Sequence, residues 1–229
     1  MLRRDYFLRI IEEFIQALAR MRSLKSEQSW QQLDEMVEAE FHRLAGTSRE
    51  ELLALDETEL LAKIIRNDSG QAVKEKVLFL ATLLKEAGDS ETARNNPEKA
   101  RTMYLKGLHL LIGVLLRNEA FEVPLFVPKV EEFVAALADA ALPSETEALL
   151  MQHYERTGQF GRAEDALYSL MELLPAEPKV IQFGMSFYQR IAAFPDSTLA
   201  EGNLPRKEVE TGLAKLNSRL RELPAPCRL

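Results

Sequence analysis

Residues 150–163 of the chain read LMQHYERTGQFGRA, and residues 184–194 read GMSFYQRIAAF. A fixed distance of 34 positions relates the two stretches. A period of this length is typical of repeats whose unit is a pair of helices. It predicts an all-α fold that contains antiparallel helix pairs. The four recurring residues are Met151, Tyr154, Arg156 and Phe160, which return as Met185, Tyr188, Arg190 and Phe194.

The sequence around Tyr154 resembles the tetratricopeptide repeat, a 34-residue unit of two helices. The resemblance covers about residues 72–194. It implies stacked helix pairs, as a right-handed superhelix or a bundle, and a role in binding peptides or proteins. The residues that match the pattern are Leu150, Tyr154, Ala163 and Pro175, and those that depart from it are Glu147, Met151 and Leu167.

An earlier helix pair is expected before these units. Leu80 and Leu84 lie on its first helix, which Gly88 is expected to end, and its second helix begins at Pro97. The loop predicted between them, residues 88–96, is longer than the repeat allows. Two further helices are expected at about 128–140 and 205–222.

The N-terminal helix, predicted at about residues 3–23, carries a broad apolar stripe that must pack on something. Glu12 and Glu13 argue against a membrane surface, so the stripe is expected to cover its own domain or to form a homodimer. Residues 3–19 also resemble the start of an uncharacterised bacterial family. The stripe consists of Tyr6, Phe7, Ile10, Ile11, Phe14, Leu18 and Met21.

Helix-start signals divide the first part of the chain into short helices. A polar capping residue followed three positions later by Glu or Gln predicts a helix N-terminus. The breaker at 67–70 then predicts a boundary between an N-terminal helical subdomain, 1–70, and a repeat region, 71–229. Capping residues are expected at Ser29, Ser48, Asp56 and Ser144.

Composition excludes several classes of protein. The formal net charge of −7 over 229 residues argues against non-specific nucleic-acid binding, which needs Lys and Arg on phosphates. Cys227 is the only cysteine, so the chain has no internal disulfide and no four-cysteine metal site. No signal peptide and no membrane span is apparent. These features predict a cytoplasmic protein.

We find no residue pattern that predicts catalysis, a metal or a cofactor. Gly158 and Gly161 lack the third glycine of a dinucleotide loop and are interpreted as a turn between helices. Glu38 and His42 lie one turn apart, and we interpret them as a surface pair rather than as metal ligands. His153 is expected to be structural or exposed. The chain is therefore expected not to be an enzyme.

The predicted function is binding of a peptide or protein on the concave face of the helix pairs. Arg156 and Arg190 could grip a carboxylate there, or could simply cover the helix surface with their alkyl stems. An alternative is a small-ligand or enzymatic site at the junction of the N-terminal subdomain and the repeats. The predicted partner-binding residues are Gln152, Glu155, Arg156, Ser186, Gln189 and Arg190.

Overall fold

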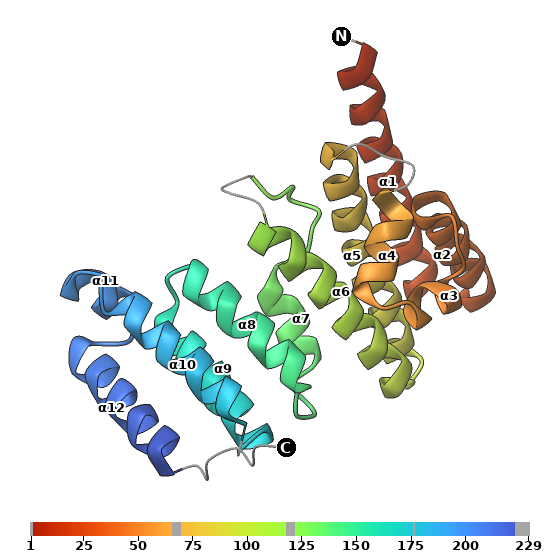
Figure 1. Ribbon diagram of the computed structural model, residues 1–229. Helices are drawn as coiled ribbons and strands as arrows, with labels where there is room; N and C mark the ends of the chain where they lie inside the picture. Colours follow the sequence, from red (N-terminus) through yellow and green to blue (C-terminus); the bar gives the residue numbers. More distant parts are fainter. Residues whose placement is uncertain (1, 66–69, 118–121, 176, 223–229) are drawn as a thin grey trace. The chain divides into compact units, whose positions relative to one another are not determined.

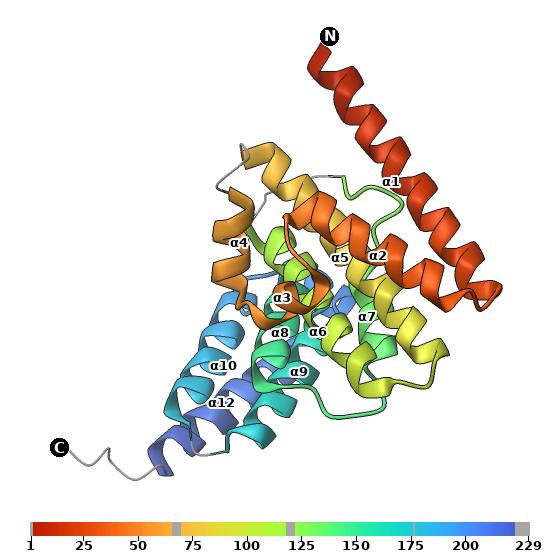
Figure 2. The same ribbon diagram turned by 90° about the vertical axis from the view of Figure 1, so that its right-hand side faces the viewer.

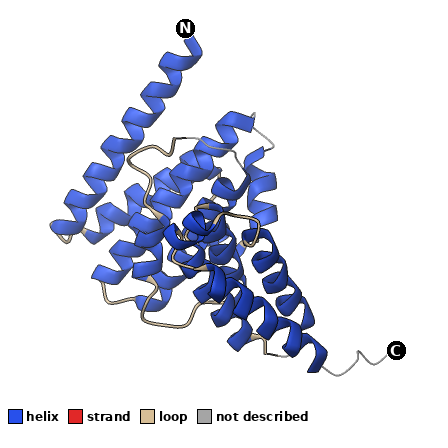
Figure 3. Cartoon of the chain, turned by 90° about the vertical axis from the view of Figure 1, so that its left-hand side faces the viewer, coloured by secondary structure: helices blue, strands red, loops and turns tan. Residues whose placement is uncertain are grey.

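The computed structural model of the chain describes residues 2–65, 70–117, 122–175 and 177–222. Every regular element in these ranges is a helix (Figure 3), which confirms the predicted all-α fold. None of these helices combines the length and apolarity that a membrane span needs. Contacts between residues divide the chain into two compact units, residues 1–141 (unit 1) and 142–229 (unit 2).

Unit 1 is built around two long antiparallel helices, α5 and α6 (Figures 1 and 2). Helix α5 also packs against α1, α2 and α4. The helices on both sides of residue 70 therefore share one core, and the division of the chain falls at residue 141 instead of at residue 70. The helices of unit 1 are α1 (Leu2–Ser26), α2 (Trp30–Ala45), α3 (Arg49–Ala54), α4 (Glu57–Ile65), α5 (Gly70–Ala93), α6 (Pro97–Arg117) and α7 (Val130–Ala136).

The prediction that Gly88 ends a helix is wrong. Gly88 lies inside α5, where a Cβ atom would be 2.4 Å from Cε1 of Tyr104 on α6. The glycine therefore allows close helix packing. Helix α5 ends instead near Asn95, which has a φ of 62°, and the N–H of Asn96 donates to the C=O of Glu91 at 2.9 Å. This pattern is a Schellman cap.

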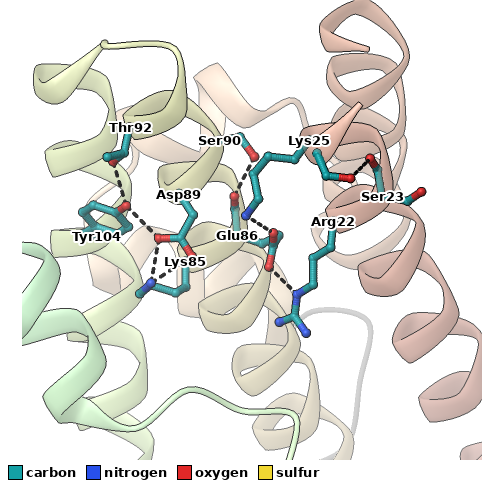
Figure 4. A network of polar contacts seen from close by, with 10 residues as sticks. Arg22, Ser23, Lys25, Lys85, Glu86, Asp89, Ser90, Thr92 and Tyr104 are labelled. Carbon is teal, nitrogen blue, oxygen red and sulfur yellow. Dashed lines mark hydrogen bonds and ion pairs between the residues drawn. The ribbon is translucent and has the colours of Figure 1, made fainter. Parts of the chain in front are cut away.

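The buried carboxylate of Glu86 attaches α1 to α5. It accepts hydrogen bonds from Arg22 Nε at 2.9 Å and from Lys25 Nζ at 2.6 Å (Figure 4). A second ion pair attaches α2, because Arg94 binds both carboxylate oxygens of Asp34 at 2.9 and 3.0 Å. Charged side chains thus connect α1 and α2 to α5, about 60 positions further along the chain.

Unit 2 contains two helix pairs. Helix α8 packs mainly on α9, and α10 packs mainly on α12, with the short α11 between them in sequence. Gly158, with a φ of +74°, ends α8 in the left-handed conformation, which confirms the predicted turn between α8 and α9. The helices are α8 (Ser144–Arg156), α9 (Phe160–Leu173), α10 (Pro178–Ile191), α11 (Asp196–Glu201) and α12 (Arg206–Glu222).

The positions related by 34 residues are alike within the helices and differ after them. Tyr154 and Tyr188 are both buried on the first helix of a pair. Phe160 is buried at the start of α9, whereas Phe194 is 44% exposed in the turn after α10. Pro195 and α11 follow this turn, so the second unit departs from the first at this point.

Two of the predicted helix caps are present. The Ser48 side chain accepts a hydrogen bond from the N–H of Glu51, and Asp56 accepts one from the N–H of Glu59. Ser29 precedes α2 without a side-chain capping bond. The prediction for Ser144 is wrong, because α8 begins one residue earlier and Pro143 stands at the capping position.

Candidate functional site

The six residues predicted to bind a partner lie on α8 and α10, the first helices of the two pairs in unit 2. Glu155 on α8 accepts hydrogen bonds from Nε and Nη2 of Arg190 on α10, at 2.6 and 2.8 Å. This bidentate pair brings the C-terminal end of α8 close to the C-terminal end of α10. The hydrogen bonds to Glu155 also raise the pKa of the Arg190 guanidinium, because they stabilise its charged form.

The other predicted residues surround this ion pair. Gln152 and Ser186 each donate a hydrogen bond to the backbone C=O four positions earlier, at 3.1 and 2.9 Å. Arg156 and Gln189 are exposed. Glu155 accepts from Nε and Nη2 of Arg190, so a partner's carboxylate would either displace Glu155 or bind the remaining Nη donors. The binding roles of all six residues remain predictions.

Unit 2 also has a hollow of about 450 Å³ beside the N-terminal end of α9. Its wall is closed by a backbone contact, in which the N–H of Gly161 donates to the C=O of Gly202 at 2.8 Å. Both positions require glycine, because a Cβ atom at Gly202 would lie 2.3 Å from the Phe160 ring and one at Gly161 would lie 2.7 Å from the Asn203 oxygen.

Glu164 is the half-buried carboxylate of this hollow. It accepts a hydrogen bond from the hydroxyl of the buried Tyr188 at 2.5 Å. Burial raises the pKa of Glu164 above its ordinary value of 4.5; the Tyr188 hydrogen bond opposes this shift, and the negative charge of Glu208 adds to it. Burial and the bond to Glu164 likewise raise the pKa of Tyr188.

The hollow supplies negative charge but not the parts of a familiar catalytic site. Its charged lining residues are Arg162, Glu164, Asp165, Glu201 and Glu208. Among the described residues that line it, there is no Ser, Cys, His or Lys that could act as a nucleophile. We therefore derive no reaction from its geometry.

The structure places His42 at the surface and His153 in the core. His42 Nε2 lies 3.5 Å from Glu38 on the exposed side of α2, in agreement with the interpretation as a surface pair. His153 is buried on α8, and its ring centre lies 5.5 Å from that of Tyr154. In the part of the chain that the structure describes, no group of three or more His, Cys, Asp or Glu could hold a metal ion.

Sequence reasoning did not find the hollow. Gly158 was interpreted correctly as part of a turn, whereas Gly161 lies in the first turn of α9. Nothing in their spacing indicates that Gly202 packs against them. The signal available in the sequence was the helix breaker Gly202-Asn203. It predicts a turn, but it does not predict which part of the chain packs against that turn. Only the folded path of α11 brings the two turns together.

No curated protein and no solved structure matches the chain. Residues 1–221 match the sequence model of DUF6483, described as a family of unknown function. This match agrees with the resemblance of residues 3–19 to an uncharacterised family and extends it over nearly all of the sequence. The chain belongs to the DUF6483 family.

Proposed function

We propose that the chain is a non-enzymatic interaction module that binds a peptide or a partner protein on the α8–α10 face. This face consists of the six predicted residues on α8 and α10. The observation that carries the proposal is the bidentate ion pair between Glu155 and Arg190, which joins the first helices of two successive pairs. In helical repeat proteins the corresponding helices line a common binding surface.

The proposal includes a tetratricopeptide-like arrangement of α8–α12. Three features support it: the 34-residue period, the burial of both Tyr154 and Tyr188, and the left-handed Gly158 between α8 and α9. The outer side of α12 carries exposed Lys207 and Glu210. A polar outer face is typical of a helix that caps the end of such an array.

The chemistry of the α8–α10 face favours a polypeptide partner. Gln152 and Gln189 offer amide groups that both donate and accept hydrogen bonds, as the peptide backbone does. The charges of Glu155 and Arg190 neutralise each other, and Arg156 is exposed on the same face. Nucleic acid requires many more basic contacts. We place the module in the cytoplasm because its single cysteine suits a reducing compartment.

Affinity capture from the native host, followed by mass spectrometry, tests the proposal. The variant Gln152→Ala/Arg156→Ala/Gln189→Ala removes exposed groups of the face without touching the buried tyrosines. Lys207→Ala/Glu210→Ala on α12 is the matched control. We expect one partner to be captured by the wild type and by the control, and to be lost with the triple variant.

Titration of the purified partner then gives the size of the effect. Loss of three polar contacts should raise the dissociation constant roughly tenfold or more. Equal affinity of the wild type and the triple variant would contradict the proposed face. Stabilisation by one small molecule in a melting screen, with no protein partner, would instead favour the alternative of a small-ligand or enzymatic site.

A further inference from the structure

The ion pair between Glu155 and Arg190 places a carboxylate of the chain itself on the α8–α10 face. Glu155 accepts hydrogen bonds from Nε and Nη2 of Arg190 at 2.6 and 2.8 Å. A bidentate pair of this kind is among the strongest ways in which arginine binds a carboxylate. Among the described residues, no second carboxylate lies within ion-pair distance of Arg190. Glu155 therefore occupies the donors that a partner's carboxylate needs for the same geometry.

The two side chains of this pair differ in their exposure to solvent. The Arg190 side chain is 50% exposed, whereas that of Glu155 is 16% exposed. A partner can thus approach the guanidinium from solvent. The donors that Glu155 leaves open are the hydrogens of Nη1 and the second hydrogen of Nη2. A carboxylate that binds only there forgoes the bidentate pair and meets the negative charge of Glu155 beside it, which is repulsive.

Glu155 is also the only acidic residue of the α8–α10 face. The face contains two arginines, Arg156 and Arg190, and its remaining residues are the uncharged Gln152, Ser186 and Gln189. When Glu155 leaves Arg190, the face offers a free guanidinium and no competing acid on it. Charge complementarity then favours an acidic segment of a partner polypeptide.

The internal pair is weak enough to open. Exposed ion pairs contribute little to stability and are screened by salt. Only molecules in which Arg190 is open bind a partner's carboxylate in the bidentate geometry, so the apparent dissociation constant rises as the open fraction falls. For a pair of this strength the closed form outweighs the open form by up to about fivefold. The apparent affinity is lowered by about the same factor.

We propose that Glu155 is an autoinhibitory contact of the α8–α10 face, which an acidic segment of the partner displaces from Arg190. The inference rests on the proposed function, because it concerns the same face, and it adds the charge of the partner. Glu155 lowers the affinity for every carboxylate that competes for Arg190. A segment that replaces the bidentate pair and also contacts the neighbouring amides overcomes this competition.

Titration of the full chain with a fluorescently labelled hexaglutamate peptide, at neutral pH and physiological salt, tests the proposal by fluorescence anisotropy. Glu155→Gln should bind the peptide up to about fivefold more tightly than the wild type, because the neutral amide forms no ion pair with Arg190. Glu155→Gln/Arg190→Gln should lose this gain. In NMR spectra of the wild type, the Nε–H signal of Arg190 should shift as the peptide replaces Glu155.

Glu145→Gln, an exposed change on the same helix, is the matched control for the loss of one negative charge, and should leave the affinity unchanged. Far-UV circular dichroism checks that each variant folds. If Glu155→Gln bound no more tightly than the wild type or this control, Glu155 would not compete for Arg190 and the proposal would be overturned. Weaker binding would also overturn it and would assign Glu155 to positioning Arg190. Absence of binding in every variant would overturn it too.

This experiment and the capture experiment fail independently. The triple variant used for capture leaves the pair of Glu155 and Arg190 intact. A partner that is captured and then lost with the triple variant, without any gain in peptide affinity for Glu155→Gln, would keep the proposed face and remove the autoinhibitory contact. A gain for Glu155→Gln without a captured partner would support the contact and count against the proposed function.

Discussion

The two units differ in how deeply their ion pairs are buried. Among the described residues, both buried carboxylates, Glu86 and Glu91, belong to unit 1, where ion pairs connect α1 and α2 to α5. In unit 2 the ion pairs lie at the surface, and α10 and α12 meet at a close contact between a glycine and an aromatic ring, of the kind that Gly88 and Tyr104 form in unit 1. Tyr188 on α10, for example, packs directly against Gly212 on α12.

This difference matters because the two kinds of contact fail in different ways. A buried charge that loses its partners leaves an uncompensated ion, which is strongly destabilising. A close glycine contact fails when atoms are added, because the packed ring has no room to move. Substitutions at the two kinds of contact therefore differ in the mechanism of destabilisation as well as in the size of the effect.

The largest effect is expected when Glu86 loses both cations. In Arg22→Ala/Lys25→Ala the carboxylate, which is 5% exposed in the wild type, loses both of its ion-pair partners. We expect the free energy of unfolding to fall by about 3–5 kcal/mol. Urea unfolding followed by the fluorescence of Trp30, the only tryptophan, reports on this unit.

The matched control is Arg20→Ala, an exposed change on the same helix with an expected effect within about 0.5 kcal/mol. Adding Glu86→Gln to the double variant should recover part of the lost stability, because it removes the buried charge. A loss below about 1 kcal/mol in the double variant would mean that water compensates Glu86, and would break the contrast between the units.

The second effect concerns the glycine contact of unit 2. A Cβ atom at Gly212 would lie 2.3 Å from Cζ of the fully buried Tyr188. Gly212→Ala should therefore lower the free energy of unfolding by about 1–3 kcal/mol. Gly113→Ala on α6 is the matched control, because nothing lies within 4 Å of its added Cβ.

The control should stabilise its helix by about 0.5–1 kcal/mol, as expected for alanine in place of an interior glycine. Chemical unfolding followed by far-UV circular dichroism measures both variants. If Gly212→Ala proved as harmless as Gly113→Ala, the tyrosine ring would have to be more mobile than its burial indicates, and the packing of unit 2 would need another explanation.

The same contrast explains how far the sequence could be interpreted. Helical period and turn residues are local signals, so the all-α fold, the pairs α8–α9 and α5–α6, and the turn at Gly158 were predicted. Ion pairs between residues about 60 positions apart, such as Arg22 with Glu86, follow only from the tertiary path. Glycine is ambiguous as well: Gly158 ends a helix, whereas Gly88 continues one because it packs against Tyr104.

The candidate face shows the same limit. The 34-residue period correctly placed Glu155 and Arg190 on the first helices of successive pairs. It did not indicate that the two side chains bind each other, because a 34-residue period relates two helices whether or not they are in contact. The opposite charges at positions 155 and 190 were visible in the sequence. They form an ion pair only because the fold brings the two side chains together.

A third, smaller effect depends on pH. Burial raises the pKa of Glu164 above 4.5, so the folded state binds this proton more tightly than the unfolded chain does. The stabilisation is complete below about pH 4.5 and is lost as the pH rises through the raised pKa. Glu164→Gln keeps an acceptor for Tyr188 and cannot ionise. Its Tm relative to wild type should therefore rise between pH 4 and neutral pH.

Thermal unfolding at a series of pH values measures this difference. Glu172→Gln, an exposed change on the same helix, is the matched control and should show little dependence of this kind. A Tm difference that is constant with pH would contradict the role of burial at Glu164. It would imply that the hydrogen bond from Tyr188 fully offsets the cost of burying the charge.

The smallest effect is expected at the ion pair of the α8–α10 face. Arg190 is 50% exposed, and exposed pairs contribute about 0–1 kcal/mol even with good geometry. Arg190→Ala, Glu155→Ala and the double variant give a cycle whose coupling energy should be below about 1 kcal/mol, measured by chemical unfolding. A coupling above about 2 kcal/mol would make the pair a structural link, like Glu86 in unit 1. A weak coupling has the opposite consequence: a partner carboxylate can then displace Glu155 from Arg190 at little cost to the stability of unit 2.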